Sequence, residues 1–110
     1  MTNTMPHRAR VQEVGMLFER VNAAALSQLE GLCREWTHRG RKSGMEYVAL
    51  NPTCLDTRLG SFRINLQNGR WADFATGDAG GDPVSLYAYL HNMRQIEAAR
   101  ALAHRLGVQP

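Results

Sequence analysis

SFRINLQNGRWADFA, residues 61–75, is the stretch that decides the fold, because two strand-like segments flank a central Asn68-Gly69 pair. Every second residue from Phe62 to Leu66 is apolar, and such alternation is typical of a half-buried strand. An Asn-Gly pair favours the positive φ angles of a tight hairpin turn. We therefore predict an antiparallel hairpin made of residues 61–66 and 70–75.

The segments before this hairpin predict one more strand and a helix. Residues 46–50 read as a short strand that ends at Asn51-Pro52, because proline cannot donate to a sheet ladder. Residues 38–44, HRGRKSG, are glycine-rich and basic, which is typical of a solvated loop. From 14 to 36 apolar residues recur at helical spacing, so we predict an amphipathic helix that Asn22 could divide by capping a second segment.

The segments after the hairpin predict two helices. A glycine-rich turn, residues 76–81, leads to Asp82 as a helix N-cap and to Pro83 at the first helical position. A helix from there to about 91 is followed by a last helix from 95 to 106, which Gly107 ends.

These elements predict an α+β fold with an N-terminal helix, a three-stranded antiparallel β-sheet and two C-terminal helices. Residues 1–12 are expected to form a flexible tail, and residues 13–110 a single domain.

Composition restricts the class of protein. The chain has 110 residues, of which 44% are hydrophobic and 21% charged, so we expect one small domain with one core. Its two cysteines, Cys33 and Cys54, are too few for a disulfide scaffold, which favours a reducing, cytoplasmic setting. Because no apolar run approaches the roughly 20 residues of a membrane span, we expect neither a membrane segment nor secretion.

The charge is mildly basic and comes almost entirely from arginine. The net charge is +3, with Lys42 the one lysine among 13 basic residues. Arginine presents a planar, bidentate donor that suits phosphate groups. A coding sequence rich in G and C would produce the same bias without any function, so both explanations remain open.

Residues 51–86 contain motifs in the order of a known family. Asn51-Pro52-Thr53-Cys54 precedes a Gly60-Ser61-Phe62-Arg63-Ile64 strand, and a second loop then runs from Asp73 to Asp82 through Gly77, Gly80 and Gly81. This segment resembles the zinc-ribbon domain at the front of bacterial and phage DNA primases, where each loop is a knuckle that supplies metal ligands. The resemblance implies a zinc-ribbon-like hairpin core and a role in replication or conjugative transfer.

The chain departs from that family at the metal ligands. The four ligand positions carry Asn51, Cys54, Asp73 and Thr76, whereas structural zinc requires four thiolate or imidazole ligands. We therefore expect these positions to be vestigial, with no bound metal and no cofactor. Instead, hydrogen bonds from Asn51, Asp73 and Thr76 to backbone groups of the turns would hold the two knuckles.

Basic and aromatic side chains on the loop and the strands predict a nucleic-acid-binding surface. Basic side chains that track the backbone, with aromatic rings that stack on bases, are typical of single-strand binding. The alternative interpretation is that the aromatic residues pack in the core and that the arginines form a solvated face. The predicted DNA-binding residues are Arg39, Arg41, Lys42, Arg63, Arg70, Trp71 and Tyr47.

Two functions follow from these patterns. The first is a non-catalytic protein that binds single-stranded DNA during replication or transfer of a mobile element. The alternative is a protein-interaction module or inhibitor that docks onto a primase, helicase or other replication protein without binding DNA. That module would use helices 83–91 and 95–106, including Leu86, Tyr89 and Met93. We expect no enzyme, since no pair of nucleophile and base is recognisable, and we expect Phe74 to be a core residue.

Overall fold

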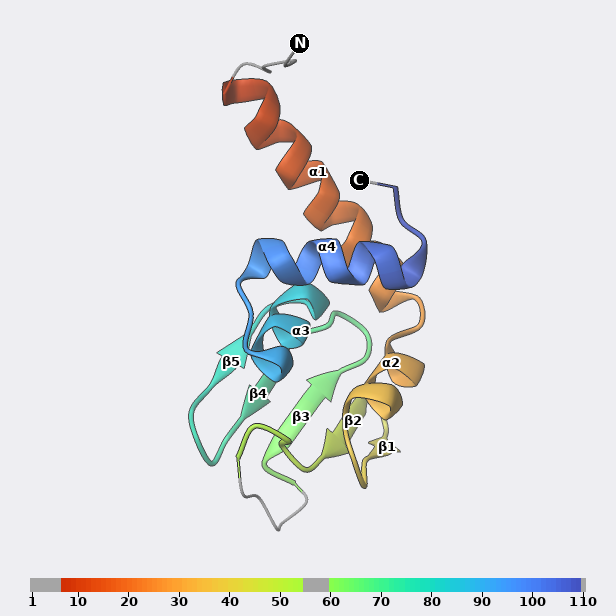
Figure 1. The fold of residues 1–110 in the computed structure, drawn as a ribbon. Helices are drawn as coiled ribbons and strands as arrows, with labels where there is room; N and C mark the ends of the chain where they lie inside the picture. The colour runs from red at the N-terminus through yellow and green to blue at the C-terminus, as the bar shows by residue number, and fades with distance from the viewer. Residues whose placement is uncertain (1–6, 55–59, 110) are drawn as a thin grey trace.

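A computed structural model describes residues 7–54 and 60–109 of the chain. Four helices and five strands follow one another in these residues (Figure 1). In chain order they are α1 (His7–Leu26), α2 (Leu29–Trp36), β1 (Arg41–Ser43), β2 (Glu46–Ala49), β3 (Phe62–Asn65), β4 (Trp71–Asp73), β5 (Ala79–Gly80), α3 (Pro83–His91) and α4 (Gln95–Leu106).

The strands form one antiparallel sheet in the order β1-β2-β3-β4-β5. Register places Lys42, Tyr47, Ile64, Trp71 and Gly80 in one row across the sheet. Residues directly opposite each other on paired strands share a face. Since Tyr47, Ile64 and Trp71 are all buried, this row belongs to the inner face, which the helices cover.

The helices lie on one side of the sheet in two layers, as Figure 1 shows. One core cluster joins the inner face of the sheet to α2 and α3, and includes Phe62, Ile64 and Leu86. A second cluster joins α1, α3 and α4, and includes Val21, Val84 and Leu102. Helix α3 contributes to both clusters and therefore connects the sheet to the outer layer of α1 and α4.

The fold prediction is confirmed at the level of the α+β class and is wrong about the architecture. The sheet has five strands instead of three, and four helices replace the predicted arrangement of one N-terminal and two C-terminal helices. The two added strands lie at the edges. Strand β1 falls within the predicted loop 38–44. Its three residues are all polar and exposed, so the sequence shows no hydrophobic alternation there. Strand β5 has two residues and lies within the predicted glycine-rich turn.

The N-terminal helical region divides at Ser27 and Gln28, five residues beyond the predicted division at Asn22. Asn22 lies inside α1, and its Oδ1 accepts a hydrogen bond from the Val84 backbone N–H at 2.9 Å. It therefore satisfies an N–H in the first turn of α3 instead of capping its own helix. Residues 7–12 of the predicted tail form the first turns of α1, and residues 1–6 lie outside the described residues.

The predicted starts and ends of the C-terminal helices are confirmed. Asp82 is the N-cap of α3 and accepts a hydrogen bond from the Ser85 N–H at 2.8 Å, with Pro83 at the first helical position. Gly107 ends α4 in the left-handed conformation with φ 70°. These ends follow local chemistry, which explains why they could be predicted from the sequence.

The hairpin between β3 and β4 has a longer loop than predicted. Asn65 and Arg70 close the loop through a backbone hydrogen bond of 2.7 Å, and the Asn65 side chain accepts from the N–H groups of Gln67 and Asn68. Only Gly69 of the Asn68-Gly69 pair has a positive φ, at 80°. A β-carbon at Gly69 would also lie 2.7 Å from Cδ of Pro83. This glycine thus allows the hairpin loop to touch the start of α3.

No helix among the described residues is both long and apolar enough to span a bilayer.

Gly69→Ala is expected to lower the free energy of unfolding by about 2–4 kcal/mol. Alanine is strained at the positive φ of this position, and its β-carbon would clash with Pro83. Gly31→Ala is the matched control. Gly31 is exposed within α2 with open space around it, so alanine should raise the free energy of unfolding by about 0.5–1 kcal/mol. Urea unfolding of both variants measures these changes in the free energy of unfolding. Equal effects at the two positions would contradict the proposed contact between hairpin loop and α3.

Candidate functional site

A buried polar network joins the two loops that correspond to the predicted knuckles. At its centre the Asn51 side chain is 1% exposed and uses both amide N–H groups. Its Nδ2 donates to Oδ2 of Asp73 at 2.7 Å and to the Tyr89 hydroxyl at 2.8 Å. Its Oδ1 accepts from the Thr53 backbone N–H at 2.9 Å and from the Thr53 hydroxyl at 2.7 Å. One amide therefore satisfies its four hydrogen-bonding positions and links the first loop to β4 and α3.

Asp73 organises the second loop in the same way. Its carboxylate is also 1% exposed, and Oδ1 accepts from the backbone N–H groups of Ala75 and Thr76 at 2.8 and 3.4 Å. The hydroxyl of Thr76 in turn accepts from the Asp78 N–H at 3.2 Å. Burial by itself raises the pKa of the Asp73 carboxyl, but hydrogen bonds from Asn51, these backbone groups and Ser61 hold the pKa below its ordinary value.

Tyr89 connects this network to α3. Its hydroxyl accepts from Asn51 and donates to the Asp78 carboxylate at 2.8 Å. Its ring lies 4.6 Å from the ring of Trp71, centroid to centroid. The indole N–H of Trp71 donates to the Ser85 hydroxyl at 2.9 Å, so β4 and α3 are joined by aromatic and polar contacts together.

The structure brings the predicted vestigial positions together. Asn51 and Asp73 are in direct contact, Thr76 is bonded to Asp73 through its backbone, and the Cys54 sulfur lies 3.9 Å from the Asn51 carbonyl oxygen. The prediction that Asn51, Asp73 and Thr76 bond to backbone groups of the turns is confirmed. Among the described residues, no three His, Cys, Asp or Glu side chains are grouped so that they could hold a metal ion.

The cysteines differ in exposure. Cys33 is buried in the core, and burial raises the pKa of its thiol to about 12, so it stays protonated at neutral pH and is a poor nucleophile. Cys54 is exposed in the first loop, where its sulfur donates weakly to the Asn51 carbonyl.

The predicted basic residues are divided between the two faces of the sheet. Arg41 and Arg63 are both paired with Val48, one from each side, and so lie on the outer face. Lys42 belongs to the inner row at the sheet edge, where its Nζ lies 3.9 Å from the Glu30 carboxylate of α2. Because adjacent strand residues point to opposite faces, Lys42 and Arg41 cannot contact one ligand on the same face.

Three of the predicted arginines differ in how firmly they are held. Arg63 is half-buried, and it donates to the Gly60 carbonyl at 2.9 Å and to the Glu46 carboxylate at 3.1 Å. Arg70 is exposed immediately before β4. Arg39 is exposed before β1 in the left-handed conformation, with φ 56°.

The predicted aromatic platforms lie in the core. Tyr47 is 2% exposed and Trp71 is 5% exposed, and both face the helices. The alternative interpretation, core packing, therefore describes them, and neither ring presents a face on which a base could stack in this structure.

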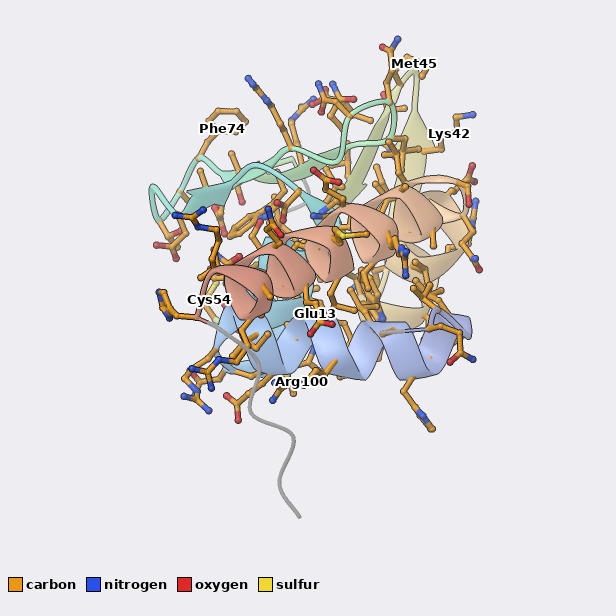
Figure 2. All side chains as sticks on the ribbon, turned by 90° about the horizontal axis from the view of Figure 1, so that it is seen from above. Glu13, Lys42, Met45, Cys54, Phe74 and Arg100 are labelled. Atoms are coloured by element: carbon orange, nitrogen blue, oxygen red, sulfur yellow. The ribbon has the colours of Figure 1, made fainter. Side chains whose placement is uncertain are left out.

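The prediction that Phe74 is a core residue is wrong, because its side chain is 73% exposed. It follows the inward-facing Asp73, and its N–H bonds to the Ser61 carbonyl at 2.8 Å, which extends the ladder between β3 and β4. Alternation then places Phe74 on the outer face, and Figure 2 shows it pointing away from α1 and α4. The same alternation in the sequence could have identified this position.

We call the helix-free side of the sheet the open sheet face. Arg41, Glu46, Arg63, Asn65 and Phe74 contribute to it. It carries two guanidinium groups, one carboxylate, one amide and one exposed aromatic ring, which together offer phosphate donors and a stacking surface.

The three residues named for the predicted protein-contact face on helices 83–91 and 95–106 differ in exposure. Leu86 is 0% exposed in the sheet core, Tyr89 is held in the polar network, and Met93 packs against the cluster of α1, α3 and α4. Leu86 therefore serves the core, whereas Tyr89 and Met93 are partly buried.

Comparisons of this chain with protein-family models, curated proteins and solved structures found no match.

The polar network predicts how stability responds to acid. The pKa of Asp73 is lower in the folded protein than its ordinary value of 3.8, so its ionised form stabilises the fold above that value. This contribution is lost as the pH falls from about 4 through the lowered pKa of the folded state. In Asp73→Asn the free energy of unfolding should be lower at neutral pH, because an amide N–H would face the Asn51 N–H, and its loss in acid should be smaller than in the wild type.

Asp78→Asn is the matched control, because its amide oxygen can still accept from Tyr89. Urea unfolding between about pH 2 and pH 7 measures the three proteins. An identical pH dependence in wild type and Asp73→Asn would show that Asp73 does not couple protonation to folding.

Proposed function

We propose that this protein binds single-stranded DNA, without catalysis, on the open sheet face. The observation that carries the proposal is the position of Phe74, a highly exposed aromatic ring on the same face as Arg41 and Arg63. A ring on the same face as guanidinium groups combines the two elements of sequence-tolerant single-strand binding, namely stacking on bases and contact with phosphates.

Each residue has a distinct role in this proposal. Phe74 stacks on a base, in place of the buried Trp71 and Tyr47. Arg63 is held by Glu46 and Gly60, which fixes its guanidinium group on the face and leaves further N–H groups for a phosphate. Arg41 extends the positive charge across the sheet, and Arg39 and Arg70 are further exposed arginines just before β1 and β4. Lys42 belongs to the other face and is outside the proposed interface.

The resemblance to primase zinc-ribbon domains supports the class of ligand and suggests replication or transfer of a mobile element as the process. The contact between the two vestigial knuckles through Asn51 and Asp73 is compatible with descent from such a ribbon. A chain with this role would act beside a primase, helicase or other replication protein that carries the catalytic groups.

The test is a titration of labelled oligothymidylate with the protein at two salt concentrations, in which fluorescence anisotropy reports binding. Phe74→Ala should weaken binding roughly 5- to 150-fold, because stacking on one base contributes about 1–3 kcal/mol. Replacing Arg41 or Arg70 with alanine should each reduce the slope of log affinity against log salt by about 0.7, since one phosphate contact fewer releases fewer counterions.

Arg100→Ala is the matched control, since Arg100 lies on α4, on the helix side of the sheet, and is exposed like Arg41. It should leave the affinity and the salt slope unchanged. Thermal unfolding should show Phe74→Ala as stable as the wild type, because the ring is mostly exposed. The proposal is wrong if no binding occurs at low salt, or if Phe74→Ala, Arg41→Ala and Arg70→Ala all bind like the wild type.

A further inference from the structure

A groove lies on the opposite side of the molecule from the open sheet face, where α1 extends beyond α4. Its volume is about 530 Å³, and its apolar lining comes from both helices: Val14, Met16 and Leu17 of α1 and Ile96 of α4. Figure 1 shows that the N-terminal half of α1 projects past α4, so the groove occupies the angle between the two helices.

The apolar stripe of α1 continues out of the core into this groove. Leu17 and Val21 are buried against α3 and α4, and Val14 lies one turn earlier on the same stripe. Val14 is 39% exposed and Met16 is 49% exposed. A helix surface with apolar residues at this spacing normally packs against another helix. The groove thus has the shape and spacing that receive an amphipathic helix.

The charges around the groove indicate which charge a bound helix would carry. Its charged lining consists of Arg20 and Arg100 against one carboxylate, Glu13, and Figure 2 shows Glu13 and Arg100 where α1 passes α4. In the described part of the chain, neither arginine has a carboxylate within 4 Å. Two guanidinium groups beside an apolar floor are complementary to carboxylates that flank an apolar stripe.

A second copy of this chain is a poorer occupant. The exposed helix that it would bring is α1 itself, which has three arginines against two glutamates and no acidic residue in its first turn. Such a helix would place positive charge beside Arg20 and Arg100, which opposes association.

We propose that the groove between α1 and α4 is a docking site for an acidic amphipathic helix of a partner protein. The apolar stripe of that helix covers Val14, Met16 and Ile96, and its carboxylates contact Arg20 and Arg100. Since this site and the open sheet face lie on opposite sides, one molecule can hold DNA and a partner protein at the same time.

The probe is a synthetic, fluorescein-labelled helical peptide of about 18 residues, with leucines at helical spacing and glutamates on the remaining face. Anisotropy with the full chain should show saturable binding that weakens with salt. A peptide of the same composition in scrambled order should bind at least about 10-fold more weakly, because it has no continuous apolar stripe.

Substitutions in the groove should separate the apolar contribution to peptide binding from the charged one. Val14→Glu should reduce affinity for the probe at least about 10-fold, whereas Val11→Glu, the same change at an exposed position of α1 outside the groove lining, should change it less than about twofold. Arg100→Glu should weaken binding of the glutamate peptide and strengthen binding of a version with lysines in place of glutamates.

Three results would overturn the proposal. They are absence of binding to the probe, equal binding by wild type and Val14→Glu, and sedimentation of the free chain as a dimer that Val14→Glu dissociates, which would assign the groove to a second copy. Phe74→Ala should bind the peptide like the wild type, and Val14→Glu should bind oligothymidylate like the wild type. The peptide-binding proposal and the DNA-binding proposal can therefore fail separately.

Discussion

The hydrogen bond between Asn51 and Asp73 joins the loop that follows β2 to the loop that follows β4. Asn51 lies just after β2, and Asp73 is the last residue of β4. Both are almost fully buried, and each uses its remaining hydrogen-bonding atoms to shape the loop that carries it. A buried amide and a buried carboxylate are costly unless they are satisfied, so the loops must meet in this one arrangement. The second N–H of the Asn51 amide donates to the Tyr89 hydroxyl, and this separate hydrogen bond positions α3.

This arrangement gives the molecule a helix-covered side and a side of the sheet that is free of helices. Helix α3 is fixed to the inner face by the polar network, by the Trp71 to Ser85 hydrogen bond and by Leu86. The helices therefore gather on that face, and the other face stays free of them, with Phe74 turned outward as the neighbour of the inward-facing Asp73. Helix α1 packs on α3 and α4 only along its second half, which leaves its first half as a projecting arm. The proposed DNA-binding surface and the proposed partner-binding groove lie on the two sides of this division.

Sequence reasoning succeeded where local chemistry determines the structure. The ends of α3 and α4 follow from Asp82, Pro83 and Gly107, and the hydrogen bonds of Asn51, Asp73 and Thr76 to their own turns follow from side-chain chemistry. It failed where tertiary contacts decide. Strand β1 has no apolar pattern and exists because its backbone pairs with β2, and the burial of Trp71 and Tyr47 depends on which face the helices cover. The partner of Asn51 at a sequence separation of 22 residues could not be read from either loop alone.

The claim that a direct hydrogen bond between Asn51 and Asp73 holds the two loops together is tested most directly by a double-mutant cycle. The free energy of unfolding would be measured in the presence of a metal chelator for the wild type, Asn51→Ala, Asp73→Ala and the double variant. We expect a coupling energy of about 1–3 kcal/mol, as for a buried hydrogen bond to a charged group. Two single effects that simply add, within about 0.3 kcal/mol, would contradict the account.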